Sequence, residues 1–145
     1  MLPRPILFVA VATIATTTFP NLVGCGTGTG SRTRQPDLIQ RLNADASNQI
    51  DVVLGQPFAL DLPANAGTGY TWMIHGSLPA GLEETGKPAF QKDDPSRMGA
   101  PGAWRFVLVG DRAGEYEIAF EMRRAWETDE KPVRRAIVKI TVAGE

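Results

Sequence analysis

The sequence predicts an all-β domain, an immunoglobulin-like sandwich of two sheets with about seven or eight strands. From Ile50 onward, short segments with alternating apolar and polar residues are separated by Gly, Pro, Asn and Asp, and no segment has convincing helical periodicity. Two details favour the immunoglobulin-like order. Trp72 lies on the third predicted strand, where such domains bury a tryptophan. Tyr116 follows Gly114-Glu115 as a tyrosine corner does, although a tyrosine that merely packs in the core is the alternative.

The predicted strands are short and follow one another closely. In residues 82–91 the pattern is weaker, because Gly86 and Pro88 interrupt it, which is typical of an edge strand. The other strands are expected at 50–54, 58–62, 70–75, 104–109, 116–122 and 135–142, all within a domain at 48–145.

Composition excludes several classes of protein. The chain has 145 residues, which suits one domain, and 15 basic against 16 acidic side chains give a net charge of -1. That balance argues against binding nucleic acid. A hydrophobic content of 43% argues against disorder of the whole chain. The single cysteine allows no intrachain disulfide, so the domain is expected to be stabilised by its core alone.

Residues 1–25 are expected to be a signal peptide. Arg4 precedes an uncharged apolar run at 6–19, which is too short to span a bilayer comfortably. The run leads to Leu22-Val23-Gly24-Cys25, which resembles the bacterial lipobox. The resemblance implies cleavage before Cys25, lipidation of Cys25 and a lipid-anchored location in the bacterial cell envelope, with Gly26 favouring the outer membrane if the source is Gram-negative. An ordinary secretory signal with an incidental cysteine is the alternative.

Residues 26–47 are expected to form a flexible tether, because they begin with a Gly/Thr/Ser-rich run. Within the tether, residues 37–42 could form a helical turn or simply continue it. The sequence leaves both open.

Candidate binding residues lie in three predicted connections. In an immunoglobulin-like sandwich the connections at 63–69, 92–103 and 123–132 lie at one end, as antibody binding loops do. Trp126 lies beyond the end of the alternating pattern of its strand, so an exposed indole is expected there. Trp and Arg side chains often dominate the binding energy at interfaces.

The three connections resemble the loops of the chagasin family, protein inhibitors of papain-like cysteine peptidases. The family's first loop is usually Asn-Pro-Thr-Thr-Gly-Phe/Tyr, its second Gly-x-Gly-Gly and its third Arg-Pro-Trp/Phe. The similarity spans residues 48–143, in the family's order. The matching residues here are Asn65, Ala66, Gly67, Thr68, Gly69 and Tyr70, then Gly99, Ala100, Pro101 and Gly102, then Arg124, Ala125 and Trp126.

The resemblance implies reversible, competitive inhibition by loops that block the cleft of a papain-like cysteine peptidase, which could be the cell's own or a host's. The departures from the pattern are Ala66 and Gly67 in place of Pro and Thr, Pro101 within the second motif and Ala125 in place of Pro. Loss of proline frees the unfolded chain, so weaker preorganisation of the loops is expected.

A rival function is a non-inhibitory envelope lipoprotein whose immunoglobulin-like domain binds another protein through the same loops. An enzyme is not expected, because no nucleophile–base pair, metal cluster or phosphate-binding loop is evident. His75 is expected to be a surface residue and Asp93-Asp94 a solvated turn, so neither a metal nor another cofactor is predicted. The protein is expected to be a monomer.

Overall fold

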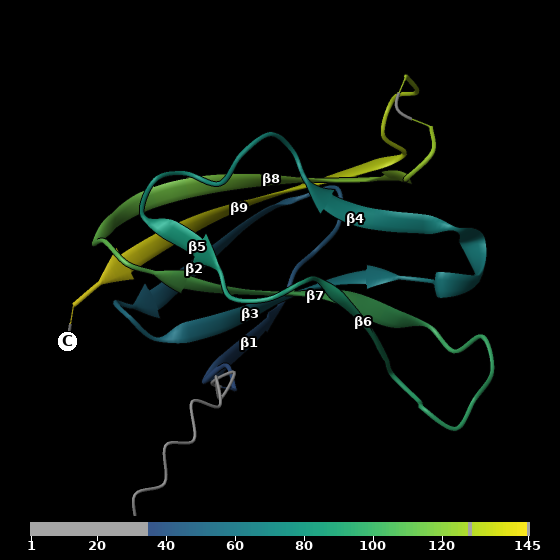
Figure 1. Ribbon diagram of the computed structural model, residues 1–145, viewed down its shortest axis with the longest axis horizontal. Coiled ribbons are helices and arrows are strands. Elements are labelled where there is room, and N and C mark those ends of the chain that lie inside the picture. The colour runs from purple at the N-terminus through teal and green to yellow at the C-terminus, as the bar shows by residue number, and fades with distance from the viewer. Residues whose placement is uncertain (1–34, 128, 145) are drawn as a thin grey trace, which may run out of the picture. The chain divides into compact units, whose positions relative to one another are not determined.

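The computed structural model of the chain describes residues 35–127 and 129–144. The described residues form nine strands in two sheets that face each other as a β-sandwich (Figure 1). The predicted fold class is therefore confirmed, with one strand more than expected. The elements are β1 (Leu38–Arg41), β2 (Ser47–Val53), β3 (Pro57–Ala64), the 3-10 turn η1 (Ala66–Thr68), β4 (Tyr70–Ile74), β5 (Leu82–Glu84), β6 (Ala89–Lys92), β7 (Gly102–Gly110), β8 (Gly114–Arg124) and β9 (Arg134–Ala143).

The strand order is that of an immunoglobulin-like sandwich. One sheet has the order β1-β3-β7-β5, with β6 also paired to β7, and the other has the order β2-β9-β8-β4. β3, β7 and β5/β6 thus occupy the places of strands B, E and D, while β4, β8 and β9 occupy those of C, F and G. β1 pairs with β3 and β2 with β9 in parallel, and the other strand pairs are antiparallel.

The N-terminal edge of the sandwich differs from expectation. The sequence predicts a tether up to residue 47, with a helical turn as the alternative for 37–42, and both are wrong for Leu38–Arg41, which is strand β1. Its four side chains are exposed, so the strand is specified by backbone pairing with β3 and has no burial pattern to read. The folded domain therefore begins before residue 48. The predicted strand at 82–91 is two strands, β5 and β6, on either side of the interruption.

Aromatic side chains from both sheets meet in the core. The rings of Phe106 on β7 and Phe120 on β8 lie 4.9 Å apart between centroids, and both are almost fully buried. Trp72 is 3% exposed, and its Nε1–H donates to the carbonyl oxygen of Pro63 at 3.0 Å. The predicted burial of Trp72 is therefore confirmed. Truncating such a buried aromatic to alanine typically costs about 3–5 kcal/mol.

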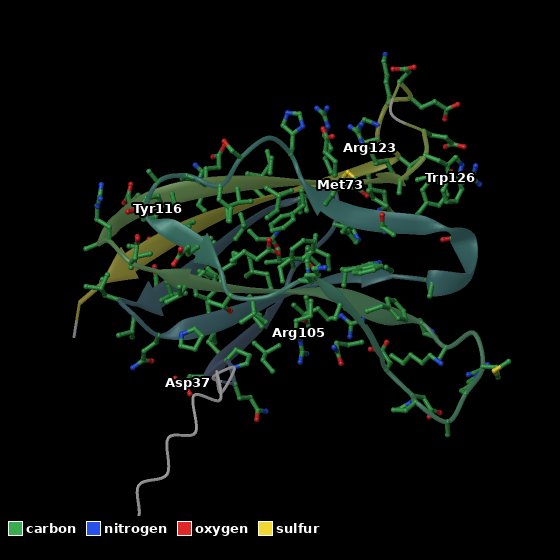
Figure 2. All side chains as sticks on the ribbon, viewed as in Figure 1. Asp37, Met73, Arg105, Tyr116, Arg123 and Trp126 are labelled. Atoms are coloured by element: carbon green, nitrogen blue, oxygen red, sulfur yellow. The ribbon has the colours of Figure 1, made fainter. Side chains whose placement is uncertain are left out.

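The tyrosine corner is also confirmed. The Tyr116 hydroxyl donates to the carbonyl oxygen of Arg112 at 2.9 Å, four residues upstream (Figure 2). Gly81 lies against that ring, and a Cβ on Gly81 would overlap the Tyr116 hydroxyl. The corner thus fixes the connection between β7 and β8 at the end of the sandwich from which β3 starts.

The expected signal peptide at 1–25, with Cys25, and residues 26–34 of the expected tether lie outside the described residues. In the part of the chain that the structure describes, no helix is long and apolar enough to cross a membrane.

Candidate functional site

Three loops extend from the same end of the sandwich: the β3–β4 loop, the β6–β7 loop and the β8–β9 loop (Figure 1). Strand pairing places the β3–β4 loop between the other two. Ala64 at the end of β3 pairs with Gly102 at the start of β7, and Tyr70 at the start of β4 pairs with Arg124 at the end of β8. The clustering of the three predicted connections is therefore present in the fold, with Trp126 at the same end (Figure 2).

The β3–β4 loop is a closed turn held by its own polar groups. The Asn65 side-chain oxygen accepts the backbone N–H of Gly67 at 3.1 Å, and the Thr68 hydroxyl donates to the carbonyl oxygen of Asn65 at 2.8 Å. Gly69 then ends the turn with φ 73°, in the left-handed region that favours glycine. Asn65, Ala66, Gly67 and Thr68 are exposed, so the turn presents its tip to solvent.

The β6–β7 loop is organised around Asp94. The Asp94 carboxylate accepts the Ser96 hydroxyl at 2.6 Å and the Ser96 backbone N–H at 3.0 Å. These hydrogen bonds stabilise the charged form and lower the pKa of Asp94 below its ordinary value. Asp93 lies 3.5 Å from Arg41, and both side chains are about half exposed. Asp93 and Asp94 thus lie in a solvated turn, as predicted.

Four predicted residues of the β6–β7 loop divide into two kinds. Gly99 and Pro101 are exposed, next to Met98, which is 93% exposed. Ala100 is only 2% exposed, and Gly102 is buried within β7, where a Cβ would overlap the carbonyl oxygen of Gln91. Gly99 and Pro101 are therefore available for contact, whereas Ala100 and Gly102 support the loop from inside.

The β8–β9 loop begins with Arg124, whose guanidinium contacts two side chains of this protein. The Arg124 guanidinium lies 4.7 Å from the centre of the Tyr70 ring and donates to the Glu127 carboxylate at 3.0 Å. The hydrogen bond to Glu127 and the negative charges around it raise the pKa of Arg124 above its ordinary value. Ala125 and Trp126 are exposed, and 70% of Trp126 is accessible, as predicted for an interface anchor.

Trp126 also lies against the β3–β4 loop. A Cβ placed on Gly69 would be 3.1 Å from Cη2 of Trp126, so the indole edge packs closely over this glycine and an added methyl group would crowd it. The β3–β4 and β8–β9 loops therefore touch at their tips as well as at their bases.

Sequence reasoning missed a buried carboxylate behind these two loops. Glu121 on β8 is 2% exposed and lies on the outer face of its sheet. Its carboxylate is paired with Arg135 at 2.8 Å, His75 at 3.2 Å and Arg123. Burial would raise the pKa of Glu121, but the Arg123 hydrogen bond and the electrostatic effect of His75, Arg123 and Arg135 outweigh it and lower the pKa. His75, as predicted, is largely exposed.

The position of Glu121 could not be read from the alternation alone, since it occupies an outward site that is usually solvated. The cross-strand register decides it, because Met73 on β4 and Arg135 on β9 stand on either side of Glu121. The cluster links β4, β8 and β9, the strands from which the β3–β4 and β8–β9 loops extend.

No metal centre is evident in the described ranges. Within residues 35–127 and 129–144, no group of three or more His, Cys, Asp or Glu side chains is placed to hold a metal ion. Arg134, next to the β8–β9 loop, forms an ion pair with Asp45 at 2.7 Å. The exposed loop tips offer a fixed shape and two large apolar side chains, Trp126 and Met98.

Residues 51–142 match the family described as Chagasin family peptidase inhibitor I42. The chain belongs to the chagasin family. No curated protein matches the chain. A chagasin-family domain is a peptidase inhibitor, so the protein is not an enzyme, and the family predicted from the three motifs is confirmed.

Two solved structures with TM-scores above 0.5 support the fold of this chagasin-family domain. The cysteine protease inhibitor EhICP2 from Entamoeba histolytica is 21% identical, with a TM-score of 0.58, over 75% of this chain and 100% of that one. Amebosin is 23% identical, with a TM-score of 0.51, over 75% and 100%. PbICP-C, solved in complex with falcipain-2, is 21% identical with a TM-score of 0.49, over 72% and 98%.

Proposed function

We propose that this chagasin-family protein inhibits papain-like cysteine peptidases reversibly and competitively, by placing its three loops in the active-site cleft. Family membership supports inhibition of a peptidase. The observation that carries the loop assignment is that the exposed tips of three loops share one end of a rigid sandwich. Trp126 and Met98 are the largest exposed apolar side chains there, 70% and 93% accessible.

The shape of the β3–β4 loop explains how the cleft is blocked without chemistry. Asn65–Gly69 would sit over the catalytic Cys–His pair. The backbone of the β3–β4 loop is closed into a 3-10 turn by Asn65 and Thr68. A cleavable peptide must instead be extended to bring its scissile carbonyl to the thiolate of the peptidase. The turn therefore occupies the site of a substrate with no peptide bond in register. Gly99 and Pro101 would contact one rim of the cleft and Trp126 the other.

Tight binding follows from the order already present in the free loops. A preformed loop loses little conformational entropy on docking, so an interface of standard size can bind with high affinity. The sequence predicts weakened preorganisation because Ala66 and Gly67 replace the family's usual Pro and Thr. The Asn65 side-chain oxygen and the Thr68 hydroxyl, both at positions that keep the family pattern, still close the turn through hydrogen bonds.

The test is a titration of papain and related peptidases with the mature protein, with substrate concentration varied. Competitive inhibition that disappears on dilution supports the proposal, and the inhibitor should be recovered uncleaved. A serine peptidase is the control. Absence of inhibition across a panel of papain-like peptidases would favour the rival function, an envelope lipoprotein that binds other proteins without inhibiting them.

We also propose that Cys25 is lipidated and that the protein is an envelope-anchored monomer. The lipobox-like Leu22-Val23-Gly24-Cys25 motivates the anchor. Asp37 donates its backbone N–H to Pro57 at the start of β3, and β3 then runs for eight residues, about 26 Å, to the loop end. An anchored chain would thus enter the domain far from its loops. Labelling with a radioactive fatty acid, abolished by Cys25→Ser, tests lipidation, and light scattering of the protein without its lipid tests the monomer.

A further inference from the structure

We infer that the β3–β4 and β8–β9 loops act as one preformed wedge, that Glu127 is the positioning residue that holds it, and that the wedge suits an apolar rather than an acidic rim on the target. The inference rests on the proposed inhibition but can be tested without it. The wedge is defined as residues 65–70 together with 124–127. None of the three sequence motifs contains Glu127.

The first contact within the wedge is at its tip. The Trp126 indole edge lies 3.1 Å from where a Cβ of Gly69 would be, so a side chain at this position would crowd the indole. Gly69 also has φ 73°, which any other residue adopts with strain. The same glycine therefore ends the turn and receives the indole.

The second contact is one residue deeper, where Arg124 connects Tyr70 to Glu127. Arg124 and Tyr70 are cross-strand neighbours, with the guanidinium 4.7 Å from the ring centre, a cation–π geometry. The Glu127 carboxylate accepts from Arg124 at 3.0 Å, and its backbone N–H donates to the Arg124 carbonyl oxygen at 3.1 Å. Glu127 thus closes the turn that carries Trp126 and fixes the guanidinium over Tyr70.

This arrangement has a consequence for the partner. The positive charge of Arg124 is matched by Glu127 and covered on one side by Tyr70, and only 37% of the side chain is accessible. An acidic residue on the target would have to compete with a carboxylate already in place. The largest exposed apolar group of the wedge is the Trp126 indole, which an apolar rim would bury. The target rim that receives the wedge is therefore expected to be apolar, and binding should depend weakly on salt.

The experiment compares Glu127→Ala and Glu127→Gln with Asp129→Asn. The last is a matched control that removes a negative charge from an exposed residue of the same loop. Two quantities are measured: the inhibition constant with its association and dissociation rates, and acrylamide quenching of Trp126, obtained as the difference between each variant and its Trp126→Phe version. The melting temperature shows whether the fold is retained.

We expect Glu127→Ala to raise the inhibition constant about tenfold, equivalent to ~1.4 kcal/mol, chiefly by slowing association, because fewer molecules hold the binding conformation. Trp126 quenching should increase and the melting temperature should stay within about 2 °C. Glu127→Gln, which keeps an acceptor oxygen, should recover part of the affinity. Asp129→Asn should change neither quantity.

Two results would overturn the inference. One is unchanged quenching of Trp126 in Glu127→Ala, which would show that Glu127 does not position the indole whether or not the protein inhibits any peptidase. The other is a fall in affinity of more than about tenfold between 50 and 500 mM NaCl for the wild type, which would indicate an ionic rather than an apolar contact. Failure of the wild type to inhibit would remove the proposed function and leave the quenching result to decide on the wedge.

Discussion

The β3–β4 and β8–β9 loops differ from the β6–β7 loop in how they are held. The first two touch each other, through Gly69 and Trp126 at the tip and through Tyr70 and Arg124 below. The β6–β7 loop is closed mainly by its own turn at Asp94, and Met98 at its tip is 93% exposed.

The difference teaches that one candidate surface can contain both a rigid and an adaptable part. A rigid wedge can bind tightly because the entropy of ordering it is lost during folding and not on binding. A loop closed mainly by local hydrogen bonds can adjust to the rim of the cleft it contacts. The wedge is therefore expected to determine affinity, and the β6–β7 loop to tolerate variation among targets. Four predictions test this division, from the largest expected effect to the smallest.

Trp126→Ala should weaken inhibition most, by about 2–4 kcal/mol, because it removes the main exposed anchor of the wedge. Inhibition constants for wild type and variant against one sensitive papain-like peptidase provide the measurement. The melting temperature should hardly change, since the indole is largely exposed. An unchanged inhibition constant would exclude Trp126 as the anchor.

Gly69→Ala should weaken inhibition by about 2 kcal/mol, since the methyl group both strains a left-handed residue and displaces Trp126. Gly55→Ala is the matched control. Gly55 has a φ of 74°, close to the 73° of Gly69, but no other atom lies within 4 Å of the position of its Cβ. Gly55 also lies at the opposite end of the sandwich from the three loops. Both variants should lose similar stability in urea, but only Gly69→Ala should lose affinity. Equal inhibition by the two would mean that the Gly69–Trp126 contact has no role in binding.

Glu121→Gln should lower stability at neutral pH by about 1–2 kcal/mol and loosen the strands beneath the wedge. The folded pKa of Glu121 lies below its ordinary value of 4.5, so the charged form stabilises the fold above that pH, and the contribution is lost as pH falls through the folded pKa. Thermal melts at pH 7 and at about pH 3 should show the wild-type advantage shrinking in acid. A constant difference between the two proteins would contradict this linkage.

Met98→Ala should cost less than about 1 kcal/mol of inhibition, because the side chain is unsupported and its loop can adjust. The same variant should have different effects on different peptidases, while Trp126→Ala should weaken all of them. A panel of papain-like peptidases measures both. A loss from Met98→Ala as large as that from Trp126→Ala would remove the proposed distinction between the loops.

The sheets and the clustering of the loops could be predicted because they follow from local patterns. Alternation identifies strands, and the tyrosine corner at Tyr116 and the buried Trp72 identify their order. β1 could not be predicted, because its four side chains are exposed and only backbone pairing with β3 specifies it. The burial of Ala100 and Gly102 also could not be predicted, because a loop has no hydrophobic periodicity that shows which residues face inward.

The sequence by itself determined the family, the sandwich and the three loops that the proposed inhibition uses, because each depends on residues close together in the chain. Only the tertiary structure decided that Trp126 rests on Gly69, that Arg124 is held by Tyr70 and Glu127, and that Glu121 is buried beside His75 and Arg135. The contacts between loops and between strands depend on strand register and loop conformation. Both are set by the whole fold rather than by any local run of residues.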